Sequence, residues 1–532
     1  MVPVETVQPV AQRPVWWWAA VVFLVAFALL LFVQGDLFVP SFDEGLNLEG
    51  ASRLLEGQRP YVDFFGHASP GAYLYQALVF RLAGQTIWTA RALVLGYQSL
   101  QIALLFWVVS RLASRKAAWC AIFVYTLIET ADPVQLTAHH RWDSSTLGFL
   151  SIAMALSGVS RIGQARGFVW WGLTGLAGVA AVIATPTAVL MGCATGGWLL
   201  LTKRWRPMAF YVSGVAAGAA PLIVWMASSD ILTGGRFGGY LGFLRFMAEN
   251  YAEANTTSFG FVQGGWLGLF DDAGVAEWLI RAPIVICLAL PVLAPLIATA
   301  AWSWWAFRGG ADLPVARSTA WYLVACQVAM LIYPFPRPDL SHLAYTSAFA
   351  CSLAAAWMAR KLPPKLAAGV ALFLMFWSLA FLYQRVTTLR NERKIATPIG
   401  SVAVASLHRS DVETLLSRVP KGDTAFVYPF MPVLNYLSQT RNPTAFLFMQ
   451  PGMMKDAQEQ ALLDDLRRTR PRWIVWFPWT RELFVKIFPG AAGLPHRFPR
   501  VEEWFEANYV LREQSQELKF NLMELRPAPI PP

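Results

Sequence analysis

Residues 16–45 read WWWAAVVFLVAFALLLFVQGDLFVPSFDEG, an apolar run that ends near the acidic pair Asp43 and Glu44. The uncharged part, 16–34, is long enough to cross the roughly 30 Å hydrocarbon core of a bilayer as a helix. The tryptophans at its start are typical of a membrane interface. We expect this helix to be retained, so that it delivers two carboxylates to the far side of a membrane.

The composition excludes an ordinary soluble domain, because 56% of the 532 residues are hydrophobic and only 14% are charged. We therefore expect a mostly α-helical, polytopic membrane protein with about eleven transmembrane helices. The predicted spans are 16–34, 88–110, 117–133, 144–159, 167–184, 187–201, 208–228, 279–305, 318–334, 343–359 and 363–383.

Basic residues gather in alternate connections between these spans, for example in 111–116, 161–166 and 203–206. The positive-inside rule places these loops and the N-terminus in the cytoplasm. We therefore expect a multi-pass protein of the inner (plasma) membrane, with Asp43 and everything after about residue 384 outside the cytoplasm. The net charge of +10 is then explained by loops beside the anionic leaflet, and we expect no nucleic-acid partner.

After about residue 390 apolar runs become shorter and charges more frequent. Short β-type runs at 424–428 and 473–477 and helical apolar spacing at 411–419 and 456–468 predict a small extracytoplasmic α/β domain. The predicted division is a transmembrane module of residues 1–390, a domain of residues 391–526 and a tail of residues 527–532.

The loop after the first span carries helix signals. Ser41 followed three residues later by Glu44 fits a capping box, and Gly57 fits a helix end before Pro60. We expect a helix over 42–56 on the outer membrane face, with Asp43 in its first turn and free to point at a substrate. Glu44 either caps this helix or takes part in the chemistry.

Three more polar segments, 59–67, 139–143 and 337–342, lie on the same predicted side. Together these segments suit transfer of a group from a lipid phosphate: a carboxylate takes a proton from the acceptor hydroxyl, and cations stabilise the leaving phosphate. Guanidinium groups bind phosphate in a bidentate way, which favours Arg141 and Arg337. The alternative is that these arginines snorkel to the lipid headgroups.

We expect neither a cofactor nor a metal. A divalent metal held by His139 and His140 with Asp43 and Asp143 is the alternative, but no HxxxH or comparable spacing supports it.

The segment FDEGLNLEGASRLLEGQRPYVDFFGHASPGAYLYQALVFRLAG, residues 42–84, resembles the first outer loop of the GT-C superfamily of polyprenyl-phosphate-sugar-dependent glycosyltransferases. Relatives in this superfamily include protein mannosyltransferases and aminoarabinose transferases acting on lipid A. The shared features are the acidic pair, a helix ending in Gly, a Pro-Tyr segment, a Pro-Gly before an amphipathic helix, and Arg91. The chain departs from many members at 67–70, where His-Ala-Ser-Pro replaces a Pro-Pro pair.

The resemblance implies an inverting transfer of a hexosyl or pentosyl group from a polyprenyl-phosphate donor to an acceptor hydroxyl outside the cytoplasm. Asp43 matches the catalytic aspartate, Glu44 its acidic neighbour and Asp143 the second acidic position. The predicted donor-phosphate site comprises Arg141, His139, Arg337 and His342. The acceptor, whether protein, lipid or glycan, the sugar and the oligomeric state are left open.

A loop over 229–278 is rich in glycine and aromatic residues and is the predicted lid over the sugar. The predicted substrate contacts are Arg59, Tyr61, His67, Tyr251 and Trp266. The alternative for the loop is an amphipathic helix at 240–252 that rests on the bilayer.

Two other functions compete with the enzyme. A transporter or flippase could use as many spans, but transporters usually place ionisable groups near the bilayer midplane, whereas charges here gather at one face. A membrane-anchored binding protein would need only one or two spans.

Overall fold

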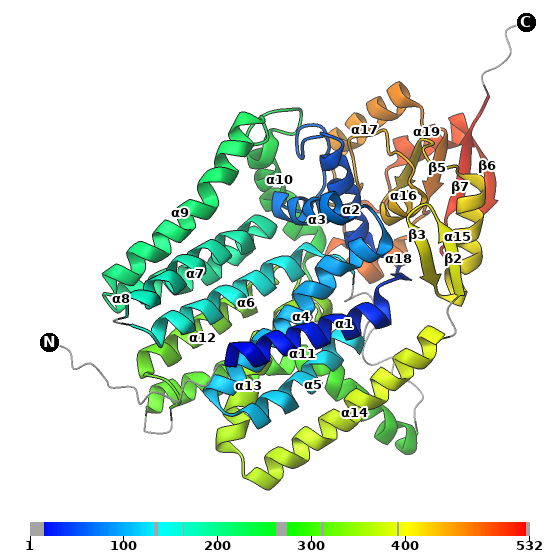
Figure 1. The fold of residues 1–532 in the computed structure, drawn as a ribbon. Coiled ribbons are helices and arrows are strands. Elements are labelled where there is room, and N and C mark those ends of the chain that lie inside the picture. The colour runs from blue at the N-terminus through cyan, green and yellow to red at the C-terminus, as the bar shows by residue number, and fades with distance from the viewer. Residues whose placement is uncertain are drawn as a thin grey trace, which may run out of the picture.

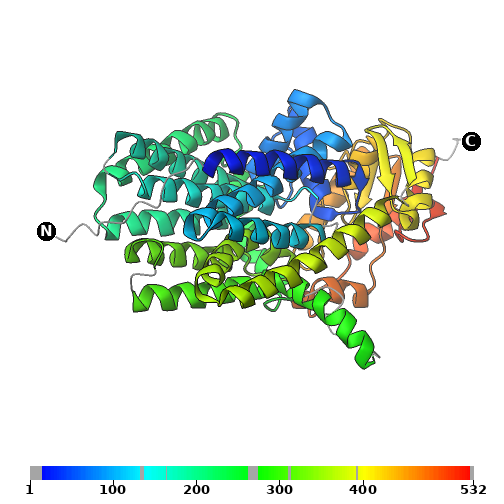
Figure 2. The ribbon, with the colours of Figure 1, turned by 60° about the horizontal axis from the view of Figure 1, so that its bottom comes forward.

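The computed structural model describes residues 15–131, 137–162, 164–261, 274–309, 313–390 and 393–527. Most of this chain is helical, and the long helices run side by side, with the C-terminal strands at one end of the bundle (Figure 1, Figure 2). The predicted tail and the residues 262–273 of the predicted lid lie outside the described residues, apart from residue 527.

Every predicted apolar run is helical in the described residues. The helices are α1 (Val15–Gln34), α4 (Ile87–Leu112), α5 (Arg115–Ala131), α6 (His140–Val159), α7 (Ala165–Ala184), α8 (Val189–Leu201), α9 (Trp205–Ser228), α11 (Val275–Arg308), α12 (Arg317–Ile332), α13 (Leu340–Lys361) and α14 (Pro364–Arg390). Five of them, α1, α4, α7, α9 and α11 from Ala289 onward, are long and apolar enough among the described residues to cross a membrane. For the other six, spanning stays a prediction.

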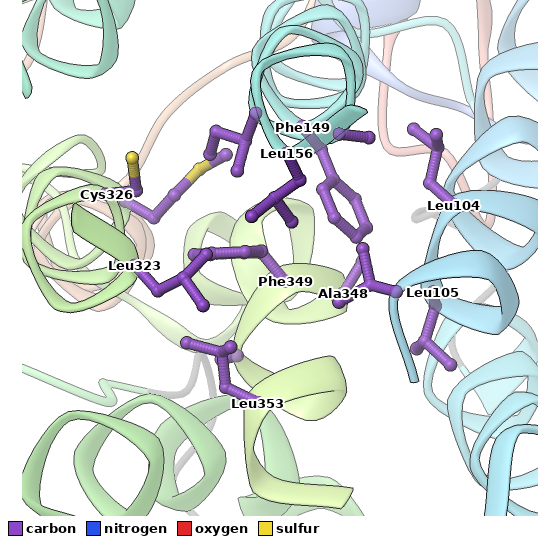
Figure 3. Close-up of a cluster of buried hydrophobic side chains, with 14 of the residues drawn as sticks. Leu104, Leu105, Phe149, Leu156, Leu323, Cys326, Ala348, Phe349 and Leu353 are labelled. Atoms are coloured by element: carbon purple, nitrogen blue, oxygen red, sulfur yellow. The ribbon is translucent and has the colours of Figure 1, made fainter. Parts of the chain in front are cut away.

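The helices pack through apolar side chains and through glycines. Side chains of α4, α6, α12 and α13 meet in one cluster, where the rings of Phe149 and Phe349 lie 5.4 Å apart (Figure 3). At the α7–α9 contact a methyl group on Gly214 would overlap the backbone of Gly172. Small residues at such crossings let membrane helices approach closely. The resulting close packing holds the helices together, because the hydrophobic effect does not drive association between helices inside lipid.

Three shorter helices, α2 (Phe42–Leu55), α3 (Pro70–Ala83) and α10 (Gly239–Asn255), lie between the bundle and the C-terminal strands (Figure 1). The prediction of a helix over 42–56 is confirmed. The Ser41 hydroxyl accepts the Glu44 N–H at 3.4 Å, and Gly57 adopts φ +85°, a left-handed conformation that favours glycine after a helix end.

The chain after residue 392 contains two sheets. The first has the order β1-β3-β2, where β1 (Leu37–Phe38) is parallel to β3 (Gly400–Val404) and β2 (Arg393–Thr397) is antiparallel to it. The second has the order β4-β5-β7-β6, formed by β4 (Ala425–Tyr428), β5 (Trp473–Trp476), β7 (Asn521–Leu525) and β6 (Tyr509–Gln514).

Five helices accompany these sheets: α15 (Ser406–Arg418), α16 (Val433–Ser438), α17 (Asp456–Thr469), α18 (Arg481–Ile487) and α19 (Pro499–Asn508). The strands expected at 424–428 and 473–477 correspond to β4 and β5, and the helices expected at 411–419 and 456–468 to α15 and α17. The sequence did not predict that β1, which precedes α2, pairs with β3. Because buried apolar clusters also combine residues from both sides of position 390, α2 and the C-terminal strands share a core.

Candidate functional site

Asp43 lies between two imidazoles from distant parts of the chain. Its Oδ1 is 3.3 Å from Nε2 of His67, and its Oδ2 is 3.5 Å from Nε2 of His139. Asp43 belongs to the first turn of α2, His67 to the segment before α3, and His139 is the N-cap residue of α6. A third of the Asp43 side chain is exposed, whereas His139 is buried. The carboxylate is therefore both fixed and accessible.

Burial shifts the pKa values of Asp43 and His139 in opposite directions. Burial raises the pKa of Asp43, but the electrostatic and hydrogen-bond interactions with His139 and His67 outweigh it, so the pKa lies well below its usual value. Burial lowers the pKa of His139 more than the nearby carboxylate raises it. Asp43 is thus ionised and His139 neutral near neutral pH.

Hydrogen bonding fixes the tautomer of His139. The backbone N–H of Arg141 donates to its Nδ1 at 3.1 Å, so Nδ1 carries a lone pair and the ring proton resides on Nε2, facing Asp43. His139 therefore serves as a hydrogen-bond donor to the carboxylate, and it also caps α6.

Glu44 does not form the predicted capping box. Its carboxylate pairs with the buried guanidinium of Arg91 and accepts the N–H of Ala138 at 3.3 Å, while the N–H of Ser41 donates to Val39 at 2.7 Å. The capping interpretation was wrong because a buried cation from α4 takes the carboxylate. Glu44 therefore ties α2 to α4 beside Asp43.

Asp143 is buried in the first turn of α6, with Tyr75 of α3 and Tyr97 of α4 as electrostatic neighbours. The ion pairs and side-chain hydrogen bonds of the described residues do not join it to Asp43. The catalytic role of Asp143 stays a prediction.

Arg141 is a buried cation two residues after His139 in the first turn of α6. Its Nη1 donates to the Tyr333 carbonyl at 3.4 Å, the guanidinium lies 5.4 Å from the Tyr333 ring centroid, and the Tyr251 side chain of α10 also interacts with it. Since a guanidinium has five N–H groups, these contacts leave donors for an anion.

Arg337 and His342 are bound to Asp339. Arg337 Nε lies 2.7 Å from Asp339 Oδ2, and His342 Nδ1 lies 2.5 Å from Asp339 Oδ1. Arg337 also donates to Asn255 of α10 at 3.3 Å and to the Ile487 carbonyl at 3.4 Å. The His342 ring lies 5.9 Å from His139, so it belongs to the same imidazole group, whereas Arg337 is occupied in joining three segments.

The predicted substrate contacts fall in different places. His67 is in the site. Tyr61 is fully buried and its hydroxyl donates to the Ala68 carbonyl at 2.5 Å, and its role as a substrate contact stays a prediction. Arg59 is exposed and pairs with Asp63 at 3.0 Å. Tyr251 reaches Arg141, and Trp266 lies outside the described residues.

Sequence reasoning missed the aromatic surroundings of the site. The ring of His140 stacks on the ring of His139 at 4.5 Å, and the ring of Tyr345 in α13 stacks on the His139 ring at 4.7 Å. Phe448, far along the chain, lies 5.2 Å from His67. The His-His pair was visible in the sequence, but nothing in it signals the approach of Phe448.

Among the described residues, no group of three or more His, Cys, Asp or Glu side chains is arranged to hold a metal ion. The expectation that the protein works without a metal stays a prediction.

The sequence matches no family model and no curated protein. Solved structures are similar. ArnT from Cupriavidus metallidurans bound to undecaprenyl phosphate aligns with a TM-score of 0.57 and 12% identity over 96% of this chain and 98% of that chain. The apo oligosaccharyltransferase of Archaeoglobus fulgidus aligns with a TM-score of 0.49 and 8% identity over 86% of this chain and 69% of that chain.

The chain therefore shares its fold with the solved ArnT structure. The likeness extends over nearly the whole length of both chains. The resemblance carried by residues 42–84 is thus confirmed at the level of the fold.

Proposed function

We propose that this protein is an inverting glycosyltransferase that moves a hexosyl or pentosyl group from a polyprenyl-phosphate donor to an acceptor hydroxyl. The observation that carries this proposal is the exposed, ionised carboxylate of Asp43, held by His67 and His139 within a GT-C fold. The solved ArnT structure contains undecaprenyl phosphate, which supports a lipid phosphate as the donor here. The reaction takes place on the extracytoplasmic side in this proposal.

The chemistry assigns separate roles to the site residues. The acceptor oxygen attacks the anomeric carbon, the bond from that carbon to the phosphate oxygen breaks with its electron pair, and the acceptor proton passes to Asp43. Arg141 binds the phosphate and stabilises the charge that it gains. The donor tail lies against the apolar helices.

The low pKa of Asp43 makes it a weak base. We infer that proton transfer is late, after the phosphate bond has stretched and the acceptor hydroxyl has become more acidic. Before that point Asp43 acts mainly as a hydrogen-bond acceptor that orients the hydroxyl. Glu44 is held by Arg91, which removes the nearest second carboxylate and favours the inverting route over a retaining one.

The decisive experiment measures bond cleavage in the donor. The purified protein in lipid nanodiscs is incubated with labelled polyprenyl-phosphate sugars and candidate acceptors, and released polyprenyl phosphate is quantified together with glycosylated product. We expect both to form with the wild-type protein and to disappear with Asp43→Asn. The matched control is Asp464→Asn, because Asp464 is an exposed aspartate of α17 that lies 3.6 Å from Arg467 and has no proposed role in the site.

Two outcomes would contradict the proposal. A transporter or flippase moves the lipid-linked sugar and leaves the donor bond intact, so translocation without released polyprenyl phosphate would replace the enzyme by that alternative. Full activity of Asp43→Asn would remove Asp43 from the chemistry. We also propose that the reaction needs no divalent metal, so activity should survive a chelator.

A further inference from the structure

The C-terminal part of the chain touches the helix that carries Asp43 at its first turn. A methyl group on Gly45 would overlap the backbone nitrogen of Val433 and would lie 2.8 Å from the carbonyl carbon of Pro432. These two residues form the start of α16. Only glycine allows α16 to approach α2 so closely, two residues after Asp43.

A second contact holds the other end of α2. The buried guanidinium of Arg53 donates to the carbonyl oxygens of Thr444 at 2.9 Å and Asn442 at 2.7 Å, and its Nε pairs with Glu49 at 3.2 Å. Charge-assisted hydrogen bonds of a buried arginine are costly to break, because the charge is left without partners. The position of α2 is thus set from both of its ends.

The same C-terminal segment also holds His67. The Phe65 N–H donates to the Ala445 carbonyl at 2.7 Å, and the Leu447 N–H donates to the Phe65 carbonyl at 3.0 Å, which forms a short backbone link two residues before His67. The Phe448 ring lies 5.2 Å from the His67 ring.

Phe42, directly before Asp43, completes the contact. Its ring packs 5.8 Å from Phe448 and 4.8 Å from Phe430. Residues 430–448 therefore contact Phe42, which precedes Asp43, and also the segment that carries His67.

We propose that residues 430–448 are a positioning element that sets the distance between Asp43 and His67, and that Gly45 is the positioning residue where this element meets α2. The inference rests on the proposed function and extends it, because it gives the C-terminal part of the chain a role in the chemistry as well as in any recognition of the acceptor. A displacement of about 1 Å at a reacting group can cost on the order of 100-fold in rate.

The test introduces a side chain at this contact. Gly45→Ala adds one methyl group where the α16 backbone lies, so α2 must shift. The matched control is Gly197→Ala in α8, where an added methyl group meets nothing within 4 Å. For Gly45→Ala we expect a fall in kcat of about 10- to 100-fold with the KM for the donor nearly unchanged. The control should match the wild-type protein.

A second measurement does not depend on the reaction. Carbethoxylation of His67 by diethyl pyrocarbonate, followed by peptide mass spectrometry, reports how well its imidazole is shielded. We expect faster modification of His67 in Gly45→Ala and also in Phe448→Leu, which removes the adjacent ring and leaves the contact between Gly45 and Val433 unchanged. The Gly197→Ala protein should be modified at the wild-type rate.

The two measurements separate the two proposals. If the wild-type protein transfers no sugar but His67 is exposed by both variants, the proposed function fails and the positioning element stands. If Gly45→Ala does not fold, Phe448→Leu carries the test. Wild-type modification rates in every folded variant, or a loss of activity that resides in the donor KM alone, would overturn the positioning role.

Discussion

The Nε2 atom of His139 lies 3.5 Å from Oδ2 of Asp43, while its Nδ1 accepts the N–H of Arg141 at 3.1 Å. One imidazole thus connects the carboxylate of α2 with the start of α6 and with the candidate phosphate-binding arginine. Because the lone pair on Nδ1 is used, His139 cannot take a second proton without losing its helix-capping bond. It stabilises the ionised form of Asp43.

The first prediction concerns the pH dependence of the reaction. His139→Asn keeps a side chain that caps helices well but removes the imidazole from Asp43. Since His139 lowers the pKa of Asp43, its loss should raise that pKa and move the acidic limb of kcat/KM to higher pH. The pH–rate profile of the variant against the wild-type protein checks this. An unmoved acidic limb would show that Asp43 does not control it.

The second prediction concerns Glu44. Glu44→Gln leaves the buried guanidinium of Arg91 without its counter-charge, and such a change typically costs about 3–5 kcal/mol of unfolding free energy. The exposed pair Glu249–Arg245 offers the control, because Glu249→Gln should change stability by no more than about 0.5 kcal/mol. Thermal unfolding in detergent measures both.

The stability and transfer activity of Glu44→Gln, taken together, also show whether Glu44 acts in the chemistry or only fixes α2. If Glu44→Gln folds with wild-type stability and still loses transfer activity, Glu44 acts in the chemistry and does not merely fix α2. Parallel losses of stability and activity support the structural role.

Local signals allowed α2 to be predicted, because Ser41 and Gly57 act through the backbone within a few residues of themselves. The apolar runs predicted the long helices for a similar reason, since length and hydropathy are local quantities. Pairing of β1 with β3 was not predictable, because Leu37 and Ala403 are brought together only by the fold of the whole chain. The contact between Gly45 and Val433 was not predictable for the same reason.

The candidate site was predicted in part. The alternation of basic loops correctly suggested that Asp43, His67 and His139 share one end of the molecule, but it could not reveal which of them touch. The burial of Tyr61 was not predicted, because an aromatic residue in a polar loop was interpreted as a substrate contact. Its backbone adopts φ +64°, and its ring packs 4.7 Å from Phe243 in the core.

The third prediction concerns stability toward acid. The folded-state pKa of His139 lies below its unfolded value of about 6.5, so folding favours the neutral ring. Its contribution to stability is fully present above pH ~6.5 and is lost as pH falls from there through the folded-state pKa. Three groups act on this ring electrostatically: Asp43, which opposes the shift, and Arg141 and His67, which add to it.

We therefore expect the thermal midpoint of the wild-type protein to fall on acidification below pH ~6.5, and to fall less in His139→Asn, which has no imidazole at this position. Asp43 contributes only at lower pH, because its folded-state pKa lies below its usual 3.8. Melting curves at a series of pH values test this. Equal acid sensitivity of the two proteins would show that His139 does not titrate as its surroundings dictate.

The fourth prediction separates the two arginines that the sequence placed at the donor phosphate. Arg141 retains free N–H groups beside Tyr333 and Tyr251, whereas Arg337 is engaged with Asp339, Asn255 and the Ile487 carbonyl. Lysine keeps the charge but cannot form a bidentate contact. Arg141→Lys should therefore raise the KM for the donor by about 10-fold, the loss of roughly one charge-assisted hydrogen bond.

Arg337→Lys should leave the KM for the donor close to the wild-type value and lower the thermal midpoint instead, because it loosens the link between α10, the start of α13 and the end of α18. Steady-state kinetics with the polyprenyl-phosphate sugar, combined with melting curves, distinguish the two effects. A donor KM that rises for Arg337→Lys and not for Arg141→Lys would move the phosphate site to the Asp339 side of the imidazole group, next to His342.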